Sequence, residues 1–373
     1  MKKCAVIIGS GIVGLALAKA LSEKKWSVVI IEKSNIAQGA SIRNFGMIWP
    51  VGQPLGNLYD RAMRSREIWL DLSRKAGFWS EETGSLHLAY TELENQIIKE
   101  YVEKVQSQKS AIHLSPGQIH KKSPAAVSKG LKGGLFSQEE VLVNPREAIQ
   151  KMTEFFENHL GIQFIKGIAA SNIRGNNIVI GRKTLQADKI FVCSGSDFET
   201  LFPEEFQNHP ITKCKLQMMR LSRQPNNWRI GPPLCSGLSF IHYKAFDIAS
   251  STKILRQYFQ EHFPELIKFG IHVMVSQNGA GHLTIGDSHE YGKDPDPFNQ
   301  QQINDIIIQY LKTFANFKSW KIESYWNGIY AKMTNGDSEL VLDIDENTTI
   351  VNGLGGAGMT LAFGLAEEVV HLL

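Results

Sequence analysis

Two glycine-rich segments at opposite ends of the chain carry the residue types that bind a dinucleotide. Near the N-terminus, Gly9, Gly11 and Gly14 follow an apolar run at residues 4–8, and Glu32 stands eighteen residues after Gly14. Glycines at this spacing allow a tight turn, close approach of the backbone to a pyrophosphate, and close packing of helix on strand. An acid at the end of the second strand accepts hydrogen bonds from a ribose. The residues predicted to contact the cofactor here are Gly9, Gly11, Ile12, Val13, Gly14, Glu32 and Lys33.

The second segment, at residues 352–360, predicts another helix that begins at a glycine cluster. Such a helix directs free N–H groups and its positive end at a ligand. Where a flavin ring accepts a hydride, negative charge builds at one edge, and this helix would stabilise that charge. The contacting residues predicted here are Gly355, Gly356, Ala357, Gly358, Met359 and Thr360. The two segments together favour FAD. The N-terminal motif alone also permits a nicotinamide-dependent dehydrogenase, but the C-terminal cluster argues against one.

The elements that position these segments read as an α/β domain. Strands at 4–8 and 28–31 flank a helix that starts near Ile12, which makes a βαβ unit. Further strands are predicted at 161–168, 177–180 and 189–193, and a helix at 57–76. Asn144 and Pro145 predict another helix start, with asparagine as the cap. The expected fold is a doubly wound FAD-binding domain of the glutathione-reductase type, discontinuous over residues 1–78, 144–210 and 325–373.

Residues 79–143 and 211–324 show a different pattern and predict a substrate domain built on a mixed antiparallel sheet. Strands are expected at 213–221, 270–276 and 282–286. Helices are expected at 92–107, 251–262 and 297–316. The apolar stripe of the last helix is explained by core packing.

Length and composition narrow the function further. A chain of 373 residues is too long for one ordinary core and suits two domains. The net charge of +3 gives no basic field for nucleic acid. Cys4, Cys193, Cys214 and Cys235 lack metal-ligand spacing, which favours free thiols in a reducing compartment. The start of the chain imitates a secretory signal, but its glycine loop indicates a nucleotide-binding unit. No long apolar run predicts a membrane span, so we expect a cytoplasmic protein.

Three internal segments resemble the D-amino-acid oxidase-like superfamily, which includes glycine oxidase and sarcosine oxidase. Residues 38–46 are similar to its flavin-contacting loop, and residues 187–196 to the strand that returns to the cofactor. Trp326, Asn327 and Gly328 extend the similarity, which covers nearly the whole chain. The additional cofactor contacts that the resemblance implies are Ala40, Ser41, Arg43, Asn44, Gly46, Met47, Ile168, Cys193, Ser194, Gly195 and Gly328.

The resemblance implies oxidation of a small primary or secondary amine. A hydride passes from the carbon that bears the amine to flavin N5, and water hydrolyses the resulting imine. The protein then supplies orientation and electrostatics more than acid–base groups, so no catalytic triad is expected and no general base is assigned. In this family the second domain's sheet covers the flavin face where the substrate lies. Glycine- or sarcosine-type oxidation stays open as an alternative, as does a flavin-bound accessory protein without turnover.

The chain departs from the amino-acid oxidases at one position. Those enzymes commonly carry an arginine in a Gly-x-Arg-Pro segment that clamps the substrate carboxylate, whereas this chain has Tyr330 after Gly328. A similar subgroup with Gly-x-Tyr is associated with aminophosphonate breakdown, which implies a substrate like 2-aminoethylphosphonate. The substrate-binding candidates are Tyr330, Arg43, Asn44, Lys332 and His242, with Lys215 and His289 as further donors.

Two other features of sarcosine oxidase are missing. Its oxygen-activating lysine corresponds to Thr284 here, and its flavin-bearing cysteine has no counterpart near Tyr330. The resemblance therefore implies non-covalent FAD. Either oxygen or another carrier could accept the electrons, and the sequence does not indicate an oligomeric state.

Overall fold

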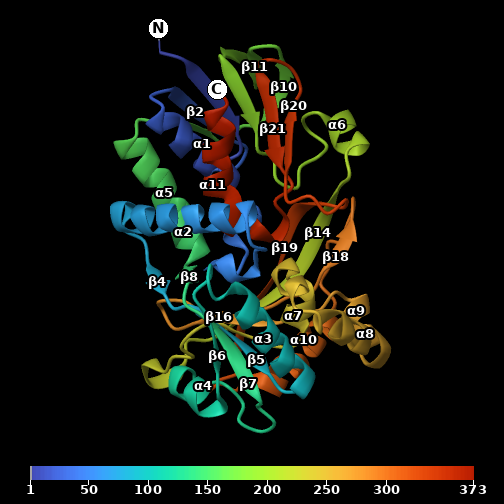
Figure 1. The fold of residues 1–373 in the computed structure, drawn as a ribbon. Coiled ribbons are helices and arrows are strands. Elements are labelled where there is room, and N and C mark those ends of the chain that lie inside the picture. Colours follow the sequence, from blue (N-terminus) through green and yellow to red (C-terminus); the bar gives the residue numbers. More distant parts are fainter. Residues whose placement is uncertain (1) are drawn as a thin grey trace.

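The computed structural model describes residues 2–373 and confirms the predicted α/β fold. Its first layer is a six-stranded sheet in the order β20-β21-β13-β1-β2-β9 (Figure 1). The strands are β1 (Cys4–Ile8), β2 (Ser27–Glu32), β9 (Gln163–Lys166), β13 (Lys189–Val192), β20 (Leu340–Asp343) and β21 (Thr348–Asn352). Every pair is parallel except β20 with β21.

Both faces of this sheet are covered, which explains the continuous apolar run in β1. Ala5 and Ile7 face a core shared with the helices α1 (Ile12–Glu23), α2 (Asn57–Ala76), α5 (Pro145–His159) and α11 (Gly358–His371). Val6 and Ile8 face a core shared with the three-stranded sheet β10 (Ala170–Arg174), β11 (Asn177–Ile180) and β12 (Lys183–Gln186). α1 and α11 lie side by side (Figure 1). A strand buried on both faces has no polar position to alternate with.

The second large sheet has nine strands. Their order is β18-β14-β17-β16-β15-β5-β7-β6, with β19 paired to β14. Its pairs are antiparallel except β15 with β5. The strands are β5 (Ser85–Ala89), β6 (Ala111–Leu114), β7 (Gly133–Ser137), β14 (Ile211–Leu221), β15 (Leu234–Cys235), β16 (Met274–Gln277), β17 (Leu283–Gly286), β18 (Glu290–Gly292) and β19 (Ile322–Met333).

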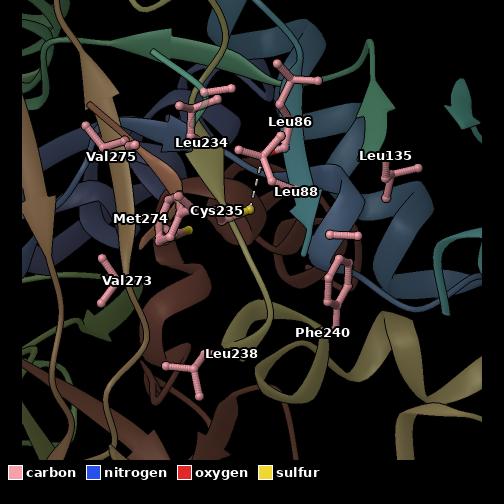
Figure 2. Close-up of a cluster of buried hydrophobic side chains, with 14 of the residues drawn as sticks. Leu86, Leu88, Leu135, Leu234, Cys235, Leu238, Phe240, Val273, Met274 and Val275 are labelled. Carbon is pink, nitrogen blue, oxygen red and sulfur yellow. Dashed lines mark hydrogen bonds between the residues drawn. The ribbon is translucent and has the colours of Figure 1, made fainter. Parts of the chain in front are cut away.

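Helices pack on this large sheet and close its core. They are α3 (Glu92–Val105), α4 (Pro116–Lys122), α7 (Leu238–His242), α8 (Thr252–His262), α9 (Pro264–Lys268) and α10 (Gln301–Phe314). Figure 2 shows part of that core, where Leu86, Leu234 and Phe240 from distant segments meet as buried side chains. The Cys235 thiol donates to the Leu86 carbonyl at 3.6 Å, so this cysteine behaves as a small core residue.

The two large sheets are joined by chain crossings and by a small sheet. β3 (Met47–Ile48), β8 (Val141–Val143) and β4 (Ser80–Glu82) form this three-stranded sheet, and α6 (Pro203–Asn208) precedes β14. The predicted domain boundary at residue 325 falls inside β19, which pairs with β14 along the large sheet. The division into two domains stays a prediction, but β19 as a whole belongs to the large sheet.

Several predicted elements differ in detail. The strand predicted at 270–276 begins at Met274, because Gly270 adopts a φ of +56° and His272 pairs outside the regular ladder with Asp287. The strand predicted at 161–168 shortens to β9, and the helix at 297–316 to α10. Asn144 precedes α5, but its side chain makes no capping hydrogen bond. The Asn144 carbonyl instead accepts from the Ala148 N–H at 2.8 Å, so the capping prediction was wrong for its side chain.

Candidate active site

A cavity of about 1010 Å³ lies where the strand ends of the six-stranded sheet meet β14 and β19. One end is lined by Gly9, Glu32 and Cys193, which lie at or just after the carboxyl ends of β1, β2 and β13. The other end is lined by Met218 of β14 and Tyr330 of β19. Ligands of open parallel sheets bind at the carboxyl ends of the strands, so this is the expected place for a dinucleotide.

The glycine loop is built so closely that side chains cannot replace its glycines. Gly9 has a φ of +104°, and a Cβ there would lie 2.4 Å from the Cys193 carbonyl oxygen. A Cβ on Gly14 would lie 2.0 Å from the Gly9 carbonyl oxygen. Gly14 does not line the cavity, so its role is to let α1 approach β1. The backbone at Gly9 and Gly11 is therefore open to a ligand, as a bound pyrophosphate requires.

The start of α1 is free of competing negative charge. Its first turn contains no acidic residue, and Gly11, Ile12 and Val13 line the cavity. The Ile12 N–H donates to the Ser41 hydroxyl at 2.9 Å, which fixes the loop at 40–46 against this helix. A helix N-terminus in this arrangement favours an anionic group.

Glu32 is buried and held in place by three hydrogen bonds. One carboxylate oxygen accepts from the Ser10 N–H at 2.9 Å and the Ser10 hydroxyl at 2.8 Å, and the other accepts from the Ser34 N–H at 3.0 Å. A carboxylate offers about four acceptor positions, so one is left for a ribose hydroxyl. Lys33, which also lines the cavity, pairs with Asp197 at 2.6 Å. Ser10 and Ser34 were not predicted as partners of Glu32. Ser10 lies inside the glycine motif, so the sequence pattern could have identified it.

The loop at 40–46 is braced by Asn44 rather than offering its side chain to a ligand. The Asn44 amide donates to the Ala40 and Ser41 carbonyls at 3.0 Å and accepts from the Gly46 N–H at 2.8 Å. Ala40, Ser41, Arg43, Asn44 and Met47 line the cavity, whereas Gly46 packs against Val143. The Arg43 guanidinium donates to the Asn327 carbonyl at 3.2 Å.

The C-terminal glycine cluster opens a second helix onto the same cavity. Residues 352–361 line it, and α11 begins at Gly358 with no acid in its first turn and no side-chain cap. The Asn352 amide donates to the Gly195 carbonyl at 3.0 Å, which joins the ends of β21 and β13. Cys193, Ser194 and Gly195 line the cavity beside it. Thr360 accepts the Trp49 N–H at 3.0 Å, so this helix also orders the unpredicted cavity residue Trp49.

Besides Gly14 and Gly46, two more predicted residues do not reach the cavity. Ile168 packs into the core between the six-stranded sheet and the sheet of β10, β11 and β12, where Gly181 leaves it room. Ala169 and Ala170 line the cavity in its place. Lys215 is buried on the opposite face of β14, where its ammonium binds Glu290 and the Phe298 carbonyl. Side chains alternate along a strand, so Lys215 must point away if Leu216 points inward. Lys215 as a substrate-anion donor is therefore a wrong prediction.

Tyr330 and Lys332 lie on the cavity side of β19. Tyr330 pairs across the sheet with Cys214, and its hydroxyl lies 3.6 Å from the position of a Cβ on Gly356. Burial, with Cys214 beside it, raises the pKa of Tyr330, so the phenol keeps its proton at neutral pH. Lys332 donates to the Tyr291 hydroxyl at 3.0 Å. Burial, with Lys244 nearby, lowers the pKa of Lys332.

A histidine cluster completes this end of the cavity. The His242 and His272 rings are stacked with centroids 3.9 Å apart, and His289 lies 5.0 Å from His242. All three rings line the cavity together with Tyr243 and Asp287. Burial lowers the pKa of His242 and His289, and the neighbouring His272 and Lys332 act in the same direction. His272, Tyr243 and Asp287 were not predicted, because no local pattern links their three segments.

Thr284 does not line the cavity; it lies on β17 opposite Arg220. All four cysteines are free, and three of them are buried while Cys4 is half-buried. Within residues 2–373, no cluster of histidine, cysteine or carboxylate side chains is arranged to hold a metal ion. The same part of the chain contains no helix that combines the length and the apolar character needed to span a bilayer.

Comparison with known structures agrees with this architecture. The fold is similar to glycine oxidase from Bacillus cereus, with a TM-score of 0.78, 17% identity, and coverage of 100% of this chain and 94% of that chain. It is similar to L-proline dehydrogenase from P. horikoshii, with a TM-score of 0.77, 20% identity, and coverage of 100% and 93%. L-α-glycerophosphate oxidase from Mycoplasma pneumoniae with FAD bound has a TM-score of 0.76, 17% identity, and coverage of 100% and 95%.

Curated relatives match part of the chain. The tRNA 5-methylaminomethyl-2-thiouridine biosynthesis bifunctional protein MnmC of Leptospira interrogans is 24% identical over 247 residues, which are 63% of this chain and 37% of that protein. The bifunctional protein ThiO/ThiG of Nostoc sp. is 25% identical over 236 residues, which are 59% of this chain and 34% of that protein. The chain thus spans about a third of the length of these relatives.

The glycine cradles, the buried acid and the two helix starts fit one dinucleotide cofactor, and the family model described as FAD dependent oxidoreductase (DAO) matches residues 5–372. FAD is the cofactor that this family uses. The chain belongs to the DAO family of FAD-dependent oxidoreductases.

Proposed function

We propose that this protein oxidises a small primary or secondary amine that carries an anionic group, with a 2-aminoethylphosphonate-like amine as substrate. Glycine oxidase and iminodiacetate oxidase are among the structurally similar proteins, which supports an amine. FAD, when bound, would supply the two-electron acceptor for a hydride from the carbon next to the nitrogen. Water then hydrolyses the imine product to a carbonyl compound and ammonia or an amine.

The observation that carries the substrate class is Tyr330 in place of a carboxylate-clamping arginine, surrounded by basic groups. Lys332 has three N–H donors and spends one on Tyr291. The ring of His289 lines the same end of the cavity, and Lys244 lies close enough to affect Lys332. An anion with three oxygens can accept from several separate donors, whereas a bidentate carboxylate is best matched by a planar guanidinium.

The glycines and helix starts support the placement of the cofactor. The pyrophosphate would lie at the start of α1, the ribose at Glu32, and the flavin ring beside α11 and the loop at 40–46. The aliphatic wall of the adenine site would come from Ala169 and Ala170 rather than Ile168. We also propose that the FAD is not covalently attached; acid precipitation should release all flavin into the supernatant.

Anaerobic reduction of the bound flavin tests the substrate. Glycine, sarcosine, 2-aminoethylphosphonate and its N-methyl and 1-hydroxy derivatives should be compared by the loss of flavin absorbance. The aminophosphonates should reduce the flavin with the highest ratio of rate to dissociation constant. Tyr330→Arg should shift the ranking toward glycine and sarcosine, whereas Tyr330→Phe should leave it unchanged. A ranking that neither substitution alters would remove Tyr330 as a selectivity residue.

Glycine- or sarcosine-type oxidation is the second candidate, and the match of glycine oxidase over the whole chain favours it. It predicts that the carboxylates reduce the flavin faster than the aminophosphonates. An accessory role predicts that no amine in the panel bleaches the flavin. Reoxidation of the reduced protein by air, compared with reoxidation by a soluble quinone or dye, identifies the electron acceptor.

A further inference from the structure

His242 offers an unpartnered imidazole to the amine end of the cavity. It is the last residue of α7, and its ring lines the cavity, where a ligand can reach it. Within residues 2–373, neither ring nitrogen of His242 makes a hydrogen bond. The other two cavity histidines each have one: His289 Nδ1 donates to the Gly270 carbonyl at 2.7 Å, and His272 Nε2 lies 3.0 Å from the Ser239 hydroxyl.

The direction of the His242 ring is fixed by its neighbours. The His272 ring lies parallel to it, with an interplanar angle of 5° and a centroid distance of 3.9 Å. Tyr243 meets the His242 ring edge-on, at 83° and 5.0 Å. His272 itself is buried between Ser239 and Asp287, whose carboxylate oxygen lies 3.5 Å from His272 Nδ1. The free nitrogen of His242 is thus held in place without a hydrogen bond of its own.

The charges around His242 keep its ring neutral at rest. A proton added to His242 would place a positive charge 3.9 Å from the stacked His272 ring and near Lys332, which disfavours it. Burial lowers the pKa of His242, and nearby cations lower it further. The titratable groups that lie against the ring are His272, His289, Lys332 and Tyr243, and Asp287 lies behind His272. A neutral imidazole has one nitrogen lone pair available to accept a proton.

The proposed reaction needs a proton acceptor. An alkylammonium has a pKa of about 10, as lysine does, so the substrate enters mainly protonated at neutral pH. Its nitrogen must regain a lone pair before the adjacent carbon can release a hydride, because that lone pair stabilises the iminium that forms. We propose that His242 removes this proton. This inference rests on the substrate being an amine, but it does not require a phosphonate.

The step is a simple proton transfer. One N–H bond of the ammonium breaks, its electron pair stays on the substrate nitrogen, and the proton binds a ring nitrogen of His242. Nothing is oxidised until the hydride leaves in the following step. The cations that disfavour a charge on His242 would also disfavour a charge on an ammonium bound beside it, so the pKa of both groups would be lowered. His272 is a positioning residue that fixes the ring by stacking, and Asp287 behind it offsets part of the new charge.

The pH dependence of flavin reduction tests the role of His242. The holoenzyme, His242→Gln and the control His282→Gln should be reduced anaerobically by a saturating amine from about pH 6 to about pH 10. His282 lies outside the cavity and pairs with Glu323 at 3.4 Å. At pH values below the pKa of the amine, the holoenzyme and the control should keep their rate of flavin reduction. In His242→Gln the rate should fall about tenfold per pH unit below that pKa, because only free amine reacts.

Binding of ethylphosphonate, which lacks the amine, separates a proton acceptor from an anion anchor. His242→Gln should bind it within about twofold of the holoenzyme. In addition, imidazole in solution should restore reduction of His242→Ala. A pH profile of His242→Gln parallel to that of the holoenzyme, or a loss explained by weaker ethylphosphonate binding, would overturn the inference and leave the proposed function intact. If no amine reduces the wild-type flavin, the inference and the proposed function both fail.

Discussion

The two ends of the cavity are specified in different ways. The nucleotide end is made of backbone: Gly9 and Gly11 follow β1 directly, and Glu32 ends the next strand. The amine end is made of side chains that come from α7, β19 and the segments before β16 and β18. A nucleotide-binding loop tolerates few residue types, whereas the amine end can change its chemistry by single substitutions. We therefore expect the first end to hold the cofactor and the second to determine the substrate.

The largest loss of FAD affinity is expected from a substitution in the glycine loop. Gly14→Ala places a Cβ 2.0 Å from the Gly9 carbonyl oxygen, so α1 must move away from β1. We expect a cost of about 3 kcal/mol, or roughly 150-fold in FAD affinity, measured by titrating the apoprotein and following flavin fluorescence. Gly39→Ala is the control, because Gly39 lines the cavity and a Cβ there meets nothing within 4 Å. Equal FAD affinity in the two variants would contradict the close-packing role of Gly14.

At the amine end, Lys332→Met should affect substrate and leave FAD binding intact. Loss of a charged hydrogen bond to the substrate anion costs about 1.5–3 kcal/mol, so the dissociation constant of an anionic amine should rise roughly 10- to 150-fold. A neutral amine of similar size should bind as before. Lys213→Met is the control, because Lys213 pairs with Glu199 on the other face of β14. If the neutral amine is weakened to the same extent, Lys332 does not anchor the anion.

The two ends of the cavity also differ in how much of them the sequence predicts. The glycine spacing, the acid at the end of β2 and the helix starts are local patterns, so the fold class and the cofactor end could be predicted. His272 and Asp287 could not, because their proximity depends on the antiparallel pairing of segments that only the structure reveals. For Lys215 the strand was predicted correctly but its face was not. A strand of unknown register leaves two choices of face, and Lys215 faces Glu290.

Glu140 supports the segment that carries the cavity residues Trp49 and Gly52, through its hydrogen bond with Val51. Its buried carboxylate accepts from the Val51 N–H at 3.0 Å and from the Ser85 hydroxyl at 2.9 Å. Val51 stands in the chain between the cavity residues Trp49 and Gly52. Burial raises the pKa of Glu140 from 4.5 to about 7. The folded protein therefore binds this proton more tightly than the unfolded chain does. The stability that the proton contributes is complete below about pH 4.5 and is lost as the pH rises through about 7.

From about pH 5 to about pH 7, the wild type should lose on the order of 2 kcal/mol of unfolding free energy relative to Glu140→Gln. Urea unfolding at several pH values measures the difference. Glu92→Gln, on a side chain that is 78% exposed, is the control and should follow the wild type. A constant difference between wild type and Glu140→Gln over this range would mean that the carboxyl is ionised throughout.

The smallest effect is expected at Ser41, where a side chain serves the nucleotide end. Ser41→Ala removes the acceptor of the Ile12 N–H and costs about 0.5–1.5 kcal/mol, or roughly 2- to 12-fold in FAD affinity. The ranking of amine substrates should stay the same. A changed ranking would show that the two ends of the cavity are coupled through the loop at 40–46.

β19 reaches both ends, and its alternation has a consequence for how such enzymes diversify. Gly328, Tyr330 and Lys332 share one face, and Lys332 also bridges to Leu354 at the C-terminal glycine cluster. Replacing a residue on that face retunes substrate choice while the ladder with β14 keeps its register. Insertion of a single residue would instead turn the whole set outward. Descent within this lineage should therefore favour point changes at every second position of β19 and select against length variation inside it.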